Sequence, residues 1–404
     1  MTSAISRQAA LLVNLNRPFL EFQQTWARLS GKSDLCDFAF GNPHDMPLPD
    51  FTRALQRHAE PQNKDWFAYK LSEPESTEVV AATLRERTGM PFEPADIAMT
   101  NGAFAAIALA IQTVIDPGDE VIFNLPPWFF YETMIVGAKA TPVKVSVKPG
   151  TFDLDLDAIR AAITPRTRAI LINSPHNPTG RIYPPDQLTE LASILTEASK
   201  RNRREIYLFS DEAYNRIVYD ERDFPSPVSF YPYSFLIYTY GKTLLTPGQR
   251  IGYLALPPTM PDREPMRLAL MMSQVAMGWA FPNALLQHAL PDLEKLSIDM
   301  EQLHWRRDRM VNALSDMGYQ VHSPEGTFYL LPKSPWEDDE AFCALLAEHD
   351  VLCLPGAVSE IPGYFRISLT ANDAMIERSL PRFQAAFQHT RTHVAPTRAA
   401  QSGD

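Results

Sequence analysis

Two ionisable side chains lie directly after apolar runs of the sequence. Lys242 follows residues 235–241 (FLIYTYG), and Asp211 follows residues 206–210 (IYLFS). Burial favours the neutral amine of a lysine, and a neutral amine can form a Schiff base with an aldehyde. A buried aspartate can stabilise a protonated ring nitrogen. Each residue alone has an ordinary alternative, because a strand-end lysine can extend to solvent and a strand-end aspartate can cap a helix.

Two polar residues lie in turns that follow such runs. The heptapeptide SPHNPTG at residues 174–180 is a strong turn signal that holds Asn177 at the edge of the predicted sheet. The Asn177 amide can donate to an oxygen on the ring of a bound aromatic aldehyde. The hydroxyl of Tyr214, three residues after Asp211, can hydrogen-bond the same oxygen. A plain loop before a helix is the alternative for the heptapeptide.

Four residues are suited to binding a phosphate group. Gly102 and Ala103 lie where the segment NGAF leads into an apolar helical pattern, and small residues at a helix start leave backbone N–H groups open to an anion. Arg250 can make a two-pronged contact with phosphate, and Thr239 can add a hydroxyl. Taken alone, the tripeptide NGA is weak evidence for such a site.

Two further side chains fit a ligand with a ring and a carboxylate. Trp128, in LPPWFFY, can stack on an aromatic ring, although core packing is the commoner role of such an indole. Arg366, in YFRISLT, lies in a predicted strand and needs an anionic partner, because an unpaired buried charge is costly. That partner is either a structural Asp or Glu or the α-carboxylate of a substrate.

The elements that position these residues alternate between strand and helix patterns. Apolar runs predict strands at residues 120–125, 168–174, 206–210, 235–240 and 250–256. Most of these runs are apolar on both faces, as is typical of strands covered by helices on both sides. Residues 184–202 carry apolar positions at helical spacing after two prolines. The pattern predicts an α/β protein with a mainly parallel sheet sandwiched by helices, and such folds bind ligands at their strand ends.

The C-terminal part has a different pattern. A long charged helix is predicted at residues 299–317, followed by strand, helix and strand patterns at residues 326–331, 337–348 and 364–369. This succession predicts a smaller α+β domain.

Composition excludes several classes of function. The chain has 404 residues and a net charge of −11, which argues against binding to nucleic acid. Its three cysteines form no C-x-x-C pair and lie beside no histidines at metal-ligand spacing, so we expect reduced thiols and no metal site. The apolar run at residues 9–13 is too short for a signal peptide, and no run is long enough for a membrane span. We therefore expect a cytoplasmic protein.

The motifs resemble those of the class I/II aminotransferases, an aspartate-aminotransferase-like group of fold type I enzymes that use pyridoxal 5′-phosphate. The resemblance runs from about residue 37 to about residue 387, and eight segments follow the family's order: NGAF, PPW, SPHNPTG, SDEAY, YGK, GQRIG, GTFYL and FRISL. It implies that Lys242 holds the cofactor and shuttles a proton, and that Asp211 pairs with the pyridine nitrogen. The other residues implied to contact cofactor or substrate are Gly41, Gly102, Ala103, Phe104, Trp128, Asn177, Tyr214, Thr239, Arg250 and Arg366. The family is dimeric, and Tyr69 is the best match for a tyrosine that reaches the neighbouring subunit's phosphate site.

The resemblance also implies a division of the chain. We assign residues 1–45 to an N-terminal arm and part of the small domain, 46–285 to a large cofactor-binding domain and 286–388 to the C-terminal small domain. Residues 389–404 are assigned to a disordered tail.

Two departures from the family pattern affect the expected chemistry. Gly241 stands where relatives often carry Ser or Ala, so one phosphate contact is expected to be missing. Phe104 stands where some aspartate aminotransferases have a lysine for a distal carboxylate. We therefore predict transfer of an amino group between a neutral or aromatic α-amino acid and a 2-oxo acid. The alternatives are a lyase that cleaves C–S bonds by β-elimination, or a specialised amino-acid-modifying enzyme on the same scaffold. A regulator is disfavoured, because about 36 residues precede the match, too few for a DNA-binding unit.

Overall fold

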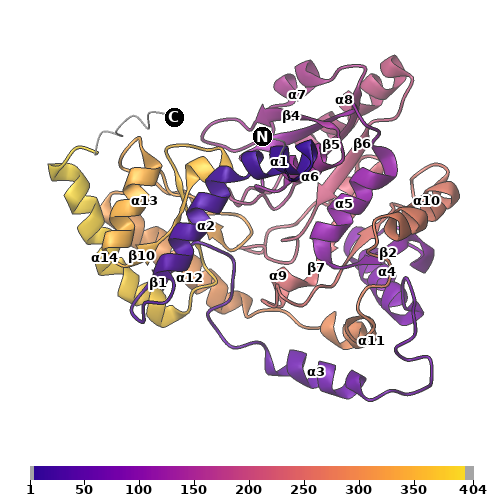
Figure 1. Cartoon of the computed structure of the whole chain (residues 1–404), viewed down its shortest axis with the longest axis horizontal. Coiled ribbons are helices and arrows are strands. Elements are labelled where there is room, and N and C mark those ends of the chain that lie inside the picture. The colour runs from indigo at the N-terminus through magenta and orange to yellow at the C-terminus, as the bar shows by residue number, and fades with distance from the viewer. Residues whose placement is uncertain (1–3, 396–404) are drawn as a thin grey trace.

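The computed structural model describes residues 4–395 and has a seven-stranded sheet at its centre (Figure 1). The strand order is β2-β8-β7-β6-β5-β3-β4. Strand β8 runs antiparallel to both of its neighbours, β2 and β7, and the other strand pairs are parallel. The bounds are β2 (Ile97–Thr100), β3 (Glu120–Leu125), β4 (Thr141–Ser146), β5 (Thr167–Asn173), β6 (Tyr207–Asp211), β7 (Ser234–Thr239) and β8 (Gly252–Ala255). The mainly parallel sheet is confirmed, and the five predicted strands correspond to β3, β5, β6, β7 and β8.

Both faces of the sheet are buried under helices. In β5, Ala169 and Leu171 point to one face, whereas Ile170 and Ile172 point to the other, as the two-residue period of a strand requires. The first face packs against α5 (Gly102–Val114), α6 (Tyr131–Gly137) and α10 (Arg263–Ala276). The opposite face packs against α7 (Leu156–Ala162) and α8 (Pro185–Asn202), and nearer β2 against α3 (Pro49–Ala59), α4 (Pro74–Thr88) and α11 (Ala284–Leu293).

A smaller α+β unit lies beside the sheet, as predicted (Figure 1). Its helices are α12 (Met300–Met317), α13 (Asp339–Glu348) and α14 (Asp373–Thr392). Its strands are β1 (Cys36–Asp37) paired with β10 (Val351–Leu352), and β11 (Leu354–Pro355), β12 (Phe365–Ser368) and β9 (Tyr329–Leu330) in one antiparallel sheet. The described chain also contains three 3-10 helices: η1 (Pro94–Asp96) and η2 (Pro227–Ser229) in the large unit and η3 (Gly356–Ser359) in the small one.

Both ends of the described chain are helical. Helices α1 (Arg7–Leu15) and α2 (Arg17–Leu29), indigo in Figure 1, contact α6 of the large unit and η3 of the small one. At the other end, α14 continues to Thr392, so residues 389–392 are helical rather than disordered. Residues 396–404 of the predicted tail lie outside the described residues. No helix within residues 4–395 is long and apolar enough to cross a membrane.

Candidate active site

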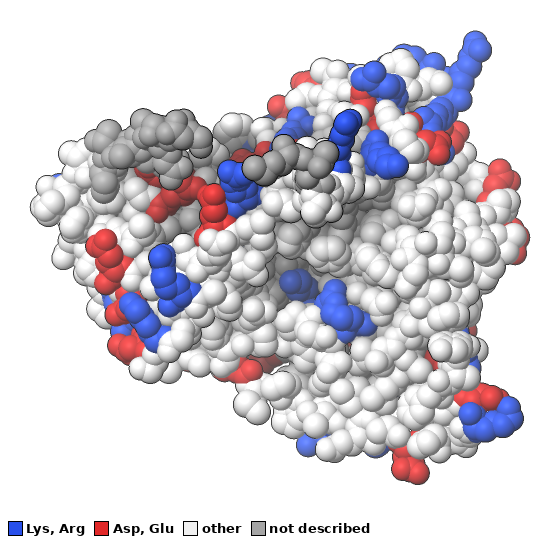
Figure 2. Space-filling model, in the orientation of Figure 1, with Lys and Arg blue, Asp and Glu red and all other residues white. Residues whose placement is uncertain are grey.

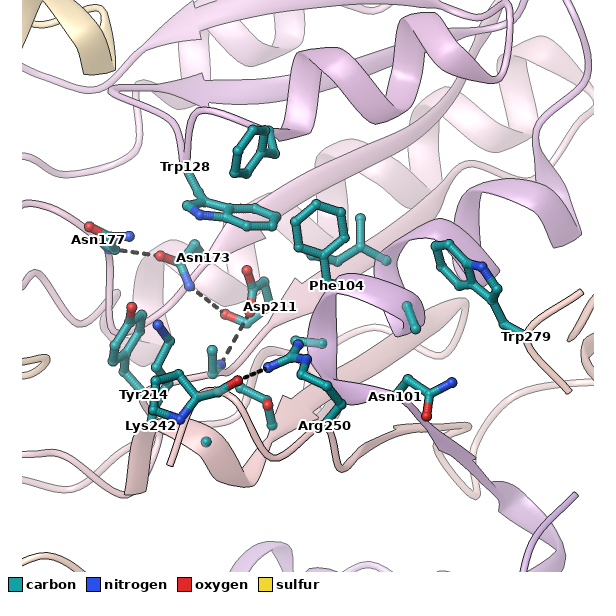
Figure 3. A pocket seen from close by; sticks show the side chains of 18 residues that line it. Asn101, Phe104, Trp128, Asn173, Asn177, Asp211, Tyr214, Lys242, Arg250 and Trp279 are labelled. Atoms are coloured by element: carbon teal, nitrogen blue, oxygen red, sulfur yellow. Dashed lines mark hydrogen bonds between the residues drawn. The ribbon is translucent and has the colours of Figure 1, made fainter. Parts of the chain in front are cut away.

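A cavity of about 530 Å³ opens at the carboxyl ends of β5, β6 and β7, beside the N-terminus of α5 (Figure 3). Parallel strands present these ends at one edge of a sheet, which brings distant parts of the sequence together. Figure 2 shows basic side chains in a hollow near the middle of one face, surrounded by uncharged residues. The cavity is lined by nine of the predicted site residues: Ala103, Phe104, Trp128, Asn177, Asp211, Tyr214, Thr239, Lys242 and Arg250.

Lys242 reaches the cavity from α9 (Tyr240–Thr243), a single helical turn that directly follows β7. Its Nζ lies 5.5 Å from the centre of the Tyr214 ring and 5.7 Å from that of the Phe328 ring. Lys242 forms no salt bridge with any carboxylate within residues 4–395. The amine is thus held among aromatic rings, with its nitrogen available to a ligand.

Asp211 is the last residue of β6 and its side chain is buried. The hydroxyl of Tyr131 donates to Oδ2, and the backbone N–H of Ala213 donates to Oδ1 at 3.2 Å. Burial raises the pKa of the Asp211 carboxyl, and the hydrogen bond from Tyr131 opposes that rise. Among the described residues that line the cavity, Asp211 is the only acidic one.

Asn177 is fixed by a network that the motif alone did not reveal. Its backbone N–H donates to Oδ1 of Asn173 at 2.7 Å, and the Asn173 amide donates to the backbone carbonyl of Asp211 at 2.8 Å (Figure 3). Next to it, the buried His176 contacts the Pro126 carbonyl through Nε2 at 2.9 Å and the Thr179 hydroxyl through Nδ1 at 2.8 Å. Burial lowers the pKa of His176 to about 4, so the ring is neutral at neutral pH.

The N-terminus of α5 lies at the cavity and is suited to binding an anion. No side chain among residues 4–395 caps this helix, so its first N–H groups are open to a ligand. Gly102 has a φ of +81°, and a Cβ there would lie 2.4 Å from Nη2 of Arg250 and 3.3 Å from Oγ1 of Thr239. Arg250 donates to the Pro247 carbonyl at 2.6 Å and forms no salt bridge within the described chain. Glycine is therefore needed for the arginine to approach the helix start.

Arg366 lies on β12 of the small unit, next to Asn177. Its Nη1 donates to Oδ1 of Asn177 at 3.2 Å and its Nη2 to the Ala39 carbonyl at 3.0 Å, while the buried Nε has no hydrogen-bond partner among residues 4–395. The guanidinium lies 4.1 Å from the centre of the Tyr329 ring. Burial alone would raise the pKa of Tyr329, but the positive charges of Arg366 and Lys242 and a hydrogen bond with Tyr214 together lower that pKa. Arg366 thus has no carboxylate partner within the described chain.

Aromatic side chains form the wall opposite Lys242 (Figure 3). The rings of Phe104 and Trp128 meet edge to face at 5.0 Å, and Phe130 lies 5.5 Å from Phe104. Phe19 of α2 packs against Phe130 at 5.2 Å from the outer side. This wall carries no charge and is suited to apolar ligand groups.

Four predicted residues are not among those that line this cavity. Gly102 and Arg366 contact lining residues, as described above, and the other two are Tyr69 and Gly41. Tyr69 is 87% exposed and its ring packs at 4.9 Å against that of Phe281. Gly41 lies against the small unit, where a Cβ would be 2.5 Å from the Tyr329 hydroxyl oxygen. Gly41 is therefore near Arg366 through Tyr329, whereas Tyr69 is exposed and does not line the cavity of its own chain.

Sequence reasoning missed several residues of the site. Asn173 lines the cavity and immediately precedes the heptapeptide, so its polar side chain at the end of an apolar run was an available signal. Tyr131, Phe130 and Trp279 gave no local signal, because each stands among other aromatic or apolar residues. Tyr329 lies within the motif GTFYL, but the sequence alone indicates no role for it.

The chain is similar to known aminotransferases in both sequence and overall structure. The family model described as aminotransferase class I and II matches residues 33–383. The aspartate/prephenate aminotransferase of Thermus thermophilus is 31% identical over 362 residues, covering 87% of this chain and 90% of that protein. An aminotransferase structure from Eubacterium rectale superposes with a TM-score of 0.88 at 27% identity, covering 96% of this chain and 99% of that one. The Thermus thermophilus aspartate aminotransferase with maleate gives a TM-score of 0.80 at 27% identity, covering 95% of this chain and all of that one. The chain belongs to the aminotransferase class I and II family.

Proposed function

We propose that this aminotransferase binds pyridoxal 5′-phosphate in the cavity and moves an amino group between an α-amino acid and a 2-oxo acid. One observation carries the proposal. Lys242 and Arg250 line a cavity with a single carboxylate among its described lining residues, and Arg366 contacts the lining residue Asn177. None of the three cations forms a salt bridge within residues 4–395. Cations without counter-ions around a concave site are suited to a ligand that carries several anionic groups.

The donors present fit each part of the cofactor. The phosphate would lie at the open N-terminus of α5, against Arg250 and the Thr239 hydroxyl. The ring nitrogen would pair with Asp211, and the ring oxygen would face Asn177 and Tyr214. When bound, pyridoxal phosphate supplies an electron sink for the electron pair released at the α-carbon of an amino acid.

The chain's own residues would then orient the substrate and move one proton. Arg366 would bind the α-carboxylate through its unpaired N–H, because a guanidinium pairs well with a carboxylate. Lys242 would act as the base that takes the proton from the substrate's α-carbon and as the acid that returns it to the cofactor's aldehyde carbon. Trp128 would cover one face of the ring and exclude water from it.

We propose a neutral or aromatic amino donor. The wall that Phe104, Trp128 and Phe130 form offers apolar surface and no cation for a second carboxylate. Burying an unpaired carboxylate against it is costly, whereas an aromatic ring gains edge-to-face contacts there. Two relatives above are named for aspartate, and the apolar Phe104 is the feature by which we distinguish this chain from a dicarboxylate-specific enzyme.

We propose that two copies form a homodimer in which Tyr69 enters the partner's phosphate site. On and after α10, the exposed apolar residues Leu268, Met272, Val275 and Phe281 lie close together along the chain, and Phe281 touches Tyr69. An apolar surface of this kind on a water-soluble chain marks an interaction site. Trp279 joins it to the cavity, which it lines.

A donor and acceptor screen on the purified protein tests the function. We expect each amino acid consumed to yield its oxo acid and one new amino acid, with neutral or aromatic donors preferred. Lys242→Ala should lose both turnover and borohydride-fixed cofactor, whereas Lys200→Ala, which removes an exposed lysine of α8, should keep both. Release of pyruvate and ammonia without an acceptor would instead indicate a lyase, and a wide preference for aspartate would overturn the proposed donor class.

A further inference from the structure

Tyr131 contacts the site from behind the cavity wall. It is the first residue of α6, only 2% exposed, and its backbone N–H donates to the Trp128 carbonyl at 3.0 Å. Its hydroxyl crosses to β6 and donates to Oδ2 of Asp211. One short segment therefore supplies both the indole that lines the cavity and a buried donor to the carboxylate within it.

The carboxylate of Asp211 has few other partners. Oδ1 accepts from the backbone N–H of Ala213, whereas Oδ2 accepts only from Tyr131 within the described chain. The Asn173 amide donates to the backbone carbonyl of Asp211 and not to its carboxylate. The other ionisable groups that face Asp211 are Lys242 and Tyr214.

We propose that Tyr131 is a positioning residue that keeps Asp211 ionised and aimed at the ring nitrogen of the bound cofactor. The inference rests on the proposed function. Without the hydroxyl, a buried Oδ2 would have no protein donor, and a buried carboxylate with fewer donors binds a proton more strongly. The proton shared between the ring nitrogen and Asp211 would then lie nearer the carboxylate, and the ring would withdraw electrons less well.

Tyr183 provides a matched control. It is also fully buried, and its hydroxyl has no hydrogen-bond partner among the described residues. Tyr131→Phe and Tyr183→Phe each remove one buried oxygen and leave a phenyl ring in place. Only Tyr131→Phe removes a hydrogen-bond donor from a carboxylate. Both variants lose a buried hydroxyl, so a difference between them reports on the loss of that donor.

The test measures binding of pyridoxamine 5′-phosphate to the apoprotein by calorimetry, from about pH 5 to about pH 8. This amine form of the cofactor makes no covalent bond with Lys242, so the titration reports on the ring and phosphate contacts. Loss of a hydrogen bond to a carboxylate raises the pKa of that carboxyl by about one unit or more. The acid limb of the binding profile is the pH range in which affinity falls as the pH falls. In Tyr131→Phe this limb should lie about one pH unit higher than in the unaltered protein. Affinity near the lower end should fall about tenfold, with Tyr183→Phe unchanged.

Site-specific replacement of Tyr131 by 3-fluorotyrosine gives a second measurement that keeps the hydroxyl in place. The more acidic phenol donates more strongly, so the acid limb should move in the opposite direction, toward lower pH. A Tyr131→Phe profile that superimposes on that of Tyr183→Phe, with normal binding in both, would overturn this inference alone. Failure of the unaltered apoprotein to bind the probe would overturn the proposed function as well.

Discussion

Replacing Gly102 with alanine places a methyl group where Arg250 now lies. The new Cβ would be 2.4 Å from Nη2 and 3.0 Å from Cζ of the guanidinium. Ordinary contact between such atoms needs about 3.5 Å or more, so the arginine must retreat by about 1 Å from the start of α5. Its contact with a phosphate group at the helix N-terminus should be lost or lengthened.

The size of this effect follows from the contact that is lost. A hydrogen bond to a charged group contributes about 1.5–3 kcal/mol, so the dissociation constant for the cofactor should rise about 10-fold to 150-fold. The backbone adds a second effect on folding, because Gly102 has a φ of +81°, a region that costs an alanine about 1 kcal/mol or more. Folding and cofactor affinity must therefore be measured separately.

Gly118→Ala is the control for backbone strain. Gly118 has a φ of +91°, and a Cβ there would have nothing within 4 Å. Both variants should lose a similar amount of stability in urea unfolding, but only Gly102→Ala should lose affinity when the apoprotein is titrated with pyridoxamine 5′-phosphate. If the dissociation constant of Gly102→Ala lies within about threefold of the control, the phosphate does not bind between Arg250 and the start of α5.

Two further changes test the aromatic wall and the heptapeptide loop. Phe104→Lys adds one charged partner for a second carboxylate, so the ratio of kcat/KM for aspartate to kcat/KM for phenylalanine should rise about tenfold. Phe104→Leu adds no charge and should not raise this ratio. Equal ratios in the two variants would contradict the proposed donor class. The free histidine side chain of the unfolded chain takes up a proton below about pH 6.5, while buried His176, with a pKa of about 4, does not. Stability should therefore rise with pH between these values, and the unaltered protein should be about 2 kcal/mol less stable at pH 5 than at pH 7 from this group. Urea unfolding at both pH values should show a smaller loss in His176→Gln, and an equal loss would contradict the assignment.

The residues at the ends of buried strands could be predicted from the sequence. Lys242 and Asp211 each follow an apolar run, and parallel strands carry such residues to one edge. The two outer strands, β2 and β4, were missed for a physical reason. β2 spans only Ile97–Thr100, and β4, at the sheet edge, contains Pro142 and lacks a continuous apolar run. Short or half-exposed strands carry too few apolar residues to show a period.

Contacts between residues far apart in the chain could not be predicted. Tyr131 and Asp211 are 80 residues apart, and nothing near either residue indicates the other. The same holds for Arg366 and Asn177, which are 189 residues apart and meet only because the small unit packs beside the sheet. Residue type and strand position therefore predicted most of the side chains that line the cavity, whereas the packing of the two units determines which groups contact each other.

One chain of hydrogen bonds joins the proposed carboxylate site to the proposed ring site. Arg366 donates to Oδ1 of Asn177, the backbone N–H of Asn177 donates to Asn173, and the Asn173 amide donates to the Asp211 carbonyl. Because Oδ1 of Asn177 already accepts from a cation, its amide must present the NH₂ group to the cavity. The orientation of that amide is thus set from the small unit, and a carboxylate that draws Arg366 away would also release Asn177. The two ends of the proposed substrate site are thus connected through this asparagine.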